Sequence, residues 1–451
     1  PPRSTPSNSS AASDVYKRQK GLLYSDKLDA IGIASSVRGI GRDLNDWMKD
    51  GVSTLYENLP SGVTSAVSRN FIHKGADRIN TYTLWDGLRG ISNHCPKNAK
   101  LLDYIAAKTA RSMWRRGDWR LFDITTIYMA GCDNYCHAVG TQDFRNPTGE
   151  LKEQMVYFLK EHTNNELKRF VDKVKANRHW HSTVFIFISD HGLVGVYHDD
   201  EHSLLREWEE QKEIEAVFNQ VEFLTGKTWG TAGKRKFVKG SKVVYSPSIG
   251  LSHIYLVGHD GKWKNPPTYG LITKLAMKLY DAATEGKYCD EMKNSLGDPP
   301  AILVRMEQED WGEGNENYRK TLGSKDYKWL KKVSGDYYLL SISELVAERG
   351  ANWCDIEKRI NGELRSDRSG DIILLFDIEN GYYSDRPERG EHGGPTKFEA
   401  EVPLVYAFQG DLQFIKDAIA QAKASNPDIE GTVKLLTWSI VEILKAVQPS
   451  Q

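Results

Sequence analysis

Short apolar runs alternate along the chain with longer segments whose apolar residues recur at helical spacing. Six runs, some of them rich in β-branched and aromatic residues, predict strands at 121–131, 183–189, 253–257, 301–305, 371–376 and 402–408. Near-continuous apolar runs of this kind are typical of strands that are covered on both faces. We therefore expect these strands to lie inside a layered structure.

Two segments carry an apolar stripe at spacings of three and four, which is typical of an amphipathic helix. One spans 151–176 and contains Leu151, Met155, Phe158, Leu159, Leu167, Phe170, Val171 and Val174. The other contains Val433, Leu436, Ile440, Leu444 and Val447. Strands that alternate with helices predict an α/β layered sheet. The region from about 206 to 350 is richer in charge, glycine and tryptophan, and we expect it to be a cap inserted between two halves of the core.

Composition places the chain in the globular class. The 451 residues suffice for one large domain or two ordinary ones, and they are 39% hydrophobic and 27% charged. No apolar stretch approaches the roughly 18 residues of a membrane-spanning helix. The net charge of −1 gives no general reason to expect nucleic acid or an anionic membrane as a partner. A basic run at 233–242 could touch an anionic substrate, but its isolation favours a solvated hairpin.

The first residues differ in character from the rest of the chain. Residues 1–19 are rich in serine and proline, and 10–19 (SAASDVYKRQ) resembles a translated sequencing adapter. We expect 1–19 to be non-native or disordered, and the natural protein to have been cut upstream of Lys20. In that case its own N-terminus and any export signal would not be visible. The alternative is a disordered leader of natural origin.

The cysteines do not predict a disulfide framework. They are few and odd in number, namely Cys95, Cys132, Cys136, Cys289 and Cys354. Cys132 and Cys136 could bind a metal as a C-x3-C pair, but no second pair stands near them. Small buried thiols are therefore the favoured interpretation of this pair.

Candidate chemistry gathers where predicted strands end, and in open α/β sheets ligands bind at the carboxyl ends of strands. Asp133 and His137 follow the run at 121–131, and a helical turn would put residues four apart on one face. This spacing alone is a weak signal. Asp190 and His191 follow the run at 183–189 directly. A desolvated carboxylate beside an imidazole is costly unless paired or metal-bound, and Gly192 would permit the turn that lets both reach one ion.

A third candidate, His392, lies in the glycine-rich loop 390–394 between two predicted strands. With the other two pairs it makes a set of two carboxylates and three imidazoles. Such mixed nitrogen and oxygen ligands suit zinc, with manganese or iron as alternatives. Two divalent ions about 4 Å apart can clamp the attacking and leaving oxygens of a displacement at phosphorus. A further polar cluster at 198–202 (HDDEH) is better explained as a loop leading into a helix at Ser203.

The order of these motifs is informative. D-x3-H-x2-G at 133–140, S-D-H-G at 189–192 and G-x-H-G at 390–393, followed by Val402-Pro403-Leu404, resemble the alkaline phosphatase superfamily. The motifs are most similar to those of its type I phosphodiesterase/nucleotide pyrophosphatase branch, and 70–76 is similar to a segment ahead of the first motif. The resemblance covers roughly residues 50–200 and 370–410.

The resemblance implies a fold and residue roles. It implies a layered α/β sandwich with a central, mainly parallel sheet, which would make 20–451 the catalytic domain with its cap at about 206–350. Asp133, His137 and His392 would bind one metal ion, and Asp190 and His191 would bind the other. The second ion of such proteins also takes an Asp and a nucleophilic Thr or Ser from an upstream strand. Nothing before Leu121 shows that pattern, so we expect the nucleophile to be missing and this fragment to be inactive.

The resemblance also implies an activity. The parent protein would be a metal-dependent hydrolase of small-molecule phosphate esters, of phosphodiester or nucleotide type, that works through a phospho-enzyme. A phosphomonoesterase, a phosphonate hydrolase, a sulfatase and a non-catalytic metal-binding protein on the same fold are the alternatives. The family resemblance favours a periplasmic or secreted location.

Overall fold

The computed structural model of the chain describes most of the elements that the sequence predicts. The described residues are 54–59, 61–70, 73–80, 96–115, 122–139, 147–177, 179–195, 202, 204, 212–224, 242–248, 250–258, 260–263, 267–306, 327–350, 353, 369–384, 390–409, 413, 416–417, 420 and 424. The leader 1–19, nearly all of the basic run and the apolar stripe that begins at Val433 lie outside them. Among the described residues, no helix is both long and apolar enough to cross a membrane.

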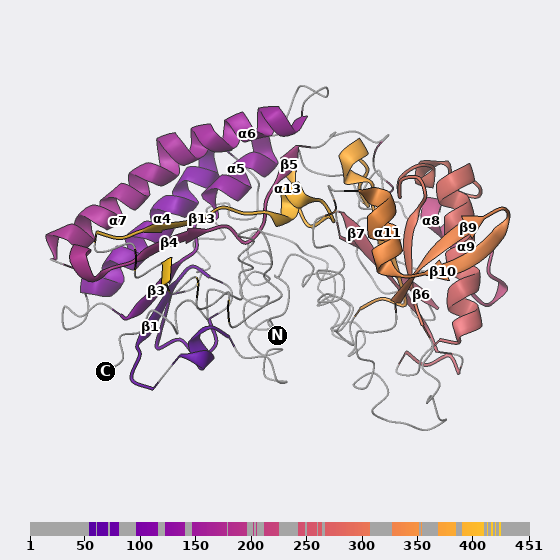
Figure 1. Cartoon of the computed structure of the whole chain (residues 1–451), viewed down its shortest axis with the longest axis horizontal. Helices are drawn as coiled ribbons and strands as arrows, with labels where there is room; N and C mark the ends of the chain where they lie inside the picture. The colour runs from indigo at the N-terminus through magenta and orange to yellow at the C-terminus, as the bar shows by residue number, and fades with distance from the viewer. Residues whose placement is uncertain are drawn as a thin grey trace.

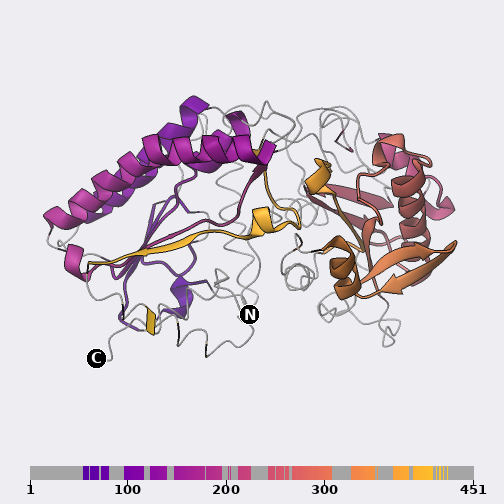
Figure 2. The ribbon, with the colours of Figure 1, turned by 45° about the horizontal axis from the view of Figure 1, so that its top comes forward.

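The described elements form two lobes (Figure 1). In the first lobe, helices α4 (Pro96–Arg115), α5 (Gly131–Val139), α6 (Pro147–Phe158) and α7 (Asn164–Ala176) form a layer over strands β1 (Ser65–Ser68), β3 (Ile124–Ile127), β4 (Phe185–Ile188) and β13 (Leu404–Ala407). Figure 2 shows this layer edge-on. The second lobe contains a larger sheet with α8 (Lys212–Phe218), α9 (Tyr269–Glu285) and α11 (Ile342–Arg349). Strand β5 (Val194–Gly195) and helix α13 (Lys397–Ala400) lie between the lobes.

The sheet of the first lobe is parallel. Its order is β2-β1-β3, with β2 at Arg78–Asn80 and all of β1 buried. The apolar runs at 183–189 and 402–408 form β4 and β13, which pair with each other antiparallel. Phe170 and Val174 of α7 pack with Ile127 and Phe185, so the core of this lobe lies between its helices and its strands.

The helix predicted at 151–176 is confirmed, but it is not continuous. α6 and α7 are joined by a π turn, η4 (Leu159–Thr163), in which the chain carries one residue more than an α-helical turn. The strand predicted at 121–131 is shorter than expected, because Gly131 already begins α5. The first pair of predicted ligands, Asp133 and His137, therefore lies on a helix that closely follows the end of a strand.

Among the described residues the larger sheet is antiparallel, so the parallel sheet that the sequence predicts is present but is the smaller of the two. The order of the larger sheet is β10-β9-β8-β11-β7-β6. These strands are β6 (Val243–Ser248), β7 (Leu251–Leu256), β8 (Ala301–Arg305), β9 (Tyr327–Val333), β10 (Asp336–Leu340) and β11 (Ile372–Leu375). Each neighbouring pair runs antiparallel. Strand β11 lies between β7 and β8, so the run at 371–376 joins strands from the region expected to be a cap.

Both faces of this sheet are covered, which explains why its strands have the apolar runs of a parallel sheet. Residues of α8 and α9, among them Phe218 and Leu279, pack on one face. Leu345 of α11 and Trp353 pack on the other face. A capping box, in which Ser341 and Glu344 hydrogen-bond to each other's backbone N–H, begins α11. The remaining short elements are the 3-10 turns η2 (Tyr56–Asn58), η5 (Trp180–Ser182), η6 (Glu222–Leu224), η7 (Asp290–Met292) and η8 (Ile378–Asn380).

One buried histidine gives this lobe a pH dependence. His253 of β7 is fully buried, and its Nδ1 accepts a hydrogen bond of 3.1 Å from the backbone N–H of Gly370. Burial and the nearby charge of Arg305 lower the pKa of His253 to about 4, from 6.5. Because the folded state holds this ring neutral, the unfolded state binds more protons between pH 6.5 and pH 4.

We expect His253→Asn to remove this pH dependence. In the wild type, the neutral buried ring of His253 contributes about 3 kcal/mol to the free energy of unfolding. This contribution is fully present above the unfolded-state pKa of 6.5 and is lost as the pH falls through the folded-state pKa of about 4. The Asn Oδ1 can accept the same N–H and does not titrate. Urea unfolding of both chains at pH 7, 5 and 4 measures the difference. Parallel pH profiles of the two chains would contradict the assignment.

Candidate metal centre

The first pair of predicted ligands lies on helix α5. Asp133 and His137 are one turn apart, and Asp133 Oδ1 lies 3.2 Å from His137 Nε2. The opposite ring nitrogen, Nδ1, lies 3.7 Å from Oε2 of Glu391, a buried residue of β12 (Gly390–Glu391). A carboxylate on the far side of a metal-binding imidazole orients the ring and raises its basicity. Glu391 lies behind the His137 ring at an ion-pair distance, and motif reasoning did not assign it, although it directly precedes His392.

The other two histidines come from loops that two short strands hold together. β5 pairs antiparallel with β12, with Gly195 opposite Gly390 and Val194 opposite Glu391. His191 precedes β5 and His392 follows β12, so the pairing brings the two residues together. Their rings are stacked, with centroids 3.6 Å apart and planes at 15°. His191 Nδ1 lies 3.0 Å from the carbonyl oxygen of Gly192, and the Nδ1–H tautomer would leave the Nε2 lone pair for a cation.

Close contact between the His191 loop and helix α13, which follows the His392 loop, requires glycine at 192. The Gly192 N–H donates a hydrogen bond of 2.9 Å to the carbonyl oxygen of Glu399. A Cβ at this position would lie 2.0 Å from the carbonyl oxygen of Phe398. The Glu399 carboxylate in turn accepts hydrogen bonds from the N–H of Gly394 and the hydroxyl of Thr396, which holds the His392 loop in shape. The glycine of S-D-H-G therefore serves the close approach of two chain segments.

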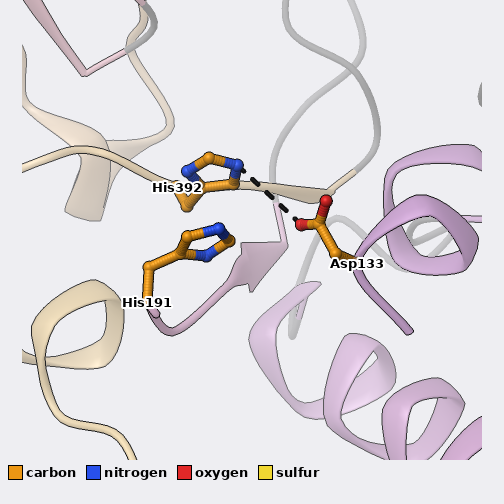
Figure 3. Close-up of side chains that lie close together, drawn as sticks. All are labelled: Asp133, His191 and His392. Atoms are coloured by element: carbon orange, nitrogen blue, oxygen red, sulfur yellow. Dashed lines mark ion pairs between the residues drawn. The ribbon is translucent and has the colours of Figure 1, made fainter. Parts of the chain in front are cut away.

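Three of the five predicted ligands converge on one point. Asp133, His191 and His392 each offer one ligand atom, and these atoms lie within 4.8 Å of one another. Figure 3 shows the carboxylate of Asp133 facing the two stacked rings. His392 Nε2 lies 3.8 Å from Asp133 Oδ1, and the side chains of His191 and His392 are only 14% and 13% exposed. His137 reaches this group through Asp133, and its ring centroid lies 5.2 Å from that of His392.

Asp190 stands at the edge of this group. Its Oδ1 lies 3.6 Å from His191 Nε2, its Oδ2 accepts a hydrogen bond of 3.3 Å from the Tyr128 hydroxyl, and its side chain is 38% exposed. The motif order assigned His137 to the ion of Asp133 and His392. In the structure it is His191 that lies in the compact group with them.

The surroundings of Asp133 hold its side chain in the charged form. Burial by itself would raise the pKa of Asp133, but the hydrogen bond with His137 and the charges of His137, His392 and His191 outweigh it. The pKa of Asp133 therefore lies well below its ordinary value, and the side chain is a carboxylate at neutral pH. One carboxylate with two or three imidazoles is a donor set that suits zinc. The residues present thus fit the ion that the sequence motifs imply.

Two other sequence candidates lie elsewhere. Cys136 is buried against Tyr135 and Phe158 in the first lobe, and Cys132 packs beside that cluster. A hydrogen bond with Cys132 and burial raise the pKa of Cys136, which disfavours the thiolate that a metal needs. Of the cluster at 198–202, the structure describes His202, whose ring lies 5.2 Å from that of Tyr382 and whose carbonyl oxygen accepts from the N–H of Tyr383.

Comparison with known proteins gives a distant likeness. The chain matches no family model and no curated protein sequence. Among solved structures it is similar to murine ectonucleotide pyrophosphatase/phosphodiesterase 5, both alone and as an inactive variant in complex with AMP, with a TM-score of 0.36 and 11% identity. The human protein gives a TM-score of 0.35 and 10% identity. The likeness covers 77% of this chain and 61% of the murine and human chains.

Proposed function

We propose that this chain belongs to a metal-dependent hydrolase of phosphate esters, with phosphodiesters or nucleotide-type esters as substrates. The observation that carries the proposal is the convergence of Asp133, His191 and His392 from three distant segments into one compact, half-buried group of a carboxylate and two imidazoles. The motif order along the chain supports the same assignment.

The five predicted ligands have distinct parts in this proposal. Asp133, His191 and His392 hold the tighter-bound ion, which is zinc. His137 contacts Asp133 and is oriented by Glu391, and Asp190 lies on the more exposed side, where a second ion would bind. A bound divalent ion supplies Lewis-acid stabilisation of charge on phosphoryl oxygens. We assign no residue of the chain as the nucleophile.

A metal titration coupled to ligand binding tests the function. We expect the chelator-treated chain to take up zinc with micromolar or better affinity, and a nucleoside monophosphate to bind only to the zinc-loaded form. An aryl phosphodiester and an aryl sulfate, offered with zinc, then separate phosphate from sulfate ester chemistry. Turnover by this chain is expected at background level, because nothing before Leu121 shows the strand pattern that would carry a Thr or Ser nucleophile.

Three outcomes would count against the proposal. A chain without measurable zinc affinity would remove its basis. Nucleotide binding that is indifferent to zinc would separate the metal from the substrate site, and preferential turnover of the aryl sulfate would move the chain to the sulfatase alternative. Zinc-dependent hydrolysis of the phosphodiester well above background would support the function and show that the missing-nucleophile prediction is wrong.

A further inference from the structure

Asp103 is a buried carboxylate that contacts none of the predicted ligands yet touches the helix that carries two of them. It lies on α4, and its side chain is almost completely buried, with 1% of the residue exposed. Its Oδ1 accepts a hydrogen bond of 2.8 Å from the backbone N–H of Gly131, the first residue of α5. Asp133 follows two residues later, and His137 follows one turn after that.

The approach of α4 to α5 is closer than any side chain at position 131 would allow. A Cβ on Gly131 would lie 2.5 Å from both Cγ and Oδ1 of Asp103, and 2.7 Å from the carbonyl oxygen of Ala99. Glycine at the first position of α5 therefore lets the carboxylate reach the helix backbone. The first N–H groups of a helix have no partner within the helix, and they carry the positive end of its dipole. A buried carboxylate satisfies both demands at once.

The second oxygen of Asp103 is tied to the π turn. Oδ2 accepts a hydrogen bond of 2.6 Å from the hydroxyl of Thr163, the last residue of η4. One carboxylate thus connects α4, the start of α5 and the junction between α6 and α7. π turns occur often at functional sites, and here the turn contains the residue whose hydroxyl contacts Asp103.

Burial of the Asp103 carboxylate costs desolvation free energy, which argues for a role beyond packing. Burial, and then the nearby Glu166 carboxylate, act against the hydrogen bonds from Thr163 and Gly131 and raise the pKa of Asp103 to about 6. An apolar side chain would fill such a position without a desolvation cost. Buried carboxylates with displaced pKa values gather near functional sites. The helix that Asp103 holds is the one that presents Asp133 and His137 to the stacked rings of His191 and His392.

We propose that Asp103 is a positioning residue of the metal centre: by anchoring the first turn of α5 it sets where Asp133 and His137 stand relative to His191 and His392. The inference rests on the proposed metal-dependent function. It assigns Asp103 no contact with the ion or the substrate.

The test compares four variants with wild type. Asp103→Ala removes both hydrogen bonds, and Asp103→Asn keeps an oxygen that can accept from Gly131. Thr163→Val removes one hydrogen bond at nearly constant shape. The matched control is Asp371→Asn, a buried carboxylate of the second lobe that accepts a hydrogen bond from the backbone N–H of Leu256 and pairs with Arg305. Zinc affinity is measured by competition with a chelator, ligand geometry by the visible spectrum of the cobalt form, and anchoring by hydrogen exchange of 131–139 in the metal-free chain.

We expect Asp103→Ala to lose about 10- to 100-fold in zinc affinity, the range found for partners that orient metal ligands. Its cobalt spectrum should change, and 131–139 should exchange faster. Asp103→Asn should retain most of the affinity, and Thr163→Val should fall between them. Asp371→Asn should lower stability without changing the zinc affinity or the cobalt spectrum, because its partners Leu256 and Arg305 lie in the second lobe. If Asp103→Ala fails to fold, the test is the order of zinc affinities, which should fall from wild type through Asp103→Asn to Thr163→Val.

The outcomes separate this inference from the proposed function. Wild-type affinity and spectrum in Asp103→Ala, or in Thr163→Val where the alanine variant does not fold, would overturn the positioning role. An equal loss of affinity in Asp371→Asn would overturn it too, because general destabilisation would then explain both. A wild-type chain that binds no zinc would refute the metal centre. In that case, hydrogen exchange of 131–139 in the metal-free chain would still test whether Asp103 anchors α5. Exchange in Asp103→Ala as slow as in wild type would show that it does not.

Discussion

Asp133→Asn is expected to weaken zinc binding by at least about 100-fold, because residues that merely orient ligands already cost about 10- to 100-fold when replaced. The substitution preserves the size of the side chain but removes its negative charge from a site where three imidazoles surround it. No other carboxylate stands in the compact group of Asp133, His191 and His392. Calorimetric titration of the chelator-treated chain measures the loss, and the proposed nucleotide binding should be lost with it.

A matched control and a comparison between histidines sharpen this test. Asp172→Asn removes an exposed carboxylate that pairs with Lys168 on α7, and zinc affinity should not change. If the compact group holds the tighter-bound ion, His191→Gln should cost more affinity than His137→Gln. A larger loss in His137→Gln would favour the grouping implied by the motifs, in which His137 binds the same ion as Asp133 and His392. Wild-type affinity in Asp133→Asn would mean that the ion is held elsewhere.

Gly192→Ala should separate the two histidine loops. The added methyl group would lie 2.0 Å from the carbonyl oxygen of Phe398, and the atoms it meets are backbone atoms that cannot rotate away. The hydrogen bond from the Gly192 N–H to Glu399 should break, and His191 should move out of its stack with His392. We expect a stability loss of about 2–3 kcal/mol, as for other overpacked sites, and a loss of zinc affinity comparable to that of Asp133→Asn.

Gly270→Ala is the control, because it replaces a glycine at which an added methyl group meets no other atom. Gly270 lies in the first turn of α9, and a Cβ there meets nothing within 4 Å. Alanine at this position should be neutral or stabilise by up to about 1 kcal/mol. Urea unfolding and zinc titration of both variants measure the contrast. If Gly192→Ala has the same stability and the same zinc affinity as Gly270→Ala, the close contact between Gly192 and α13 is not needed.

The positions of elements could be predicted where the local pattern is strong. The run at 301–305 coincides with β8, and the helix at 151–176 is present with a π turn inside it. The direction of the strands in the second lobe could not be predicted. A strand covered on both faces is apolar along its whole length whether its neighbours run parallel or antiparallel. β7, β8 and β11 are such strands, and their antiparallel pairing depends on partners from 243 to 375.

The sequence by itself determined which residue types carry the candidate chemistry and their local settings. Asp133 and His137 share a helix face because they are four residues apart, and Gly192 and the glycines around His392 mark tight turns. Only the tertiary structure decided that His191 lies with Asp133 and His392, that Glu391 lies behind His137, and that Asp103 holds the start of α5. Those relations join residues from 28 to 259 positions apart in the chain. No local spacing encodes them, because they arise when helices and loops pack, and packing depends on every surface that meets.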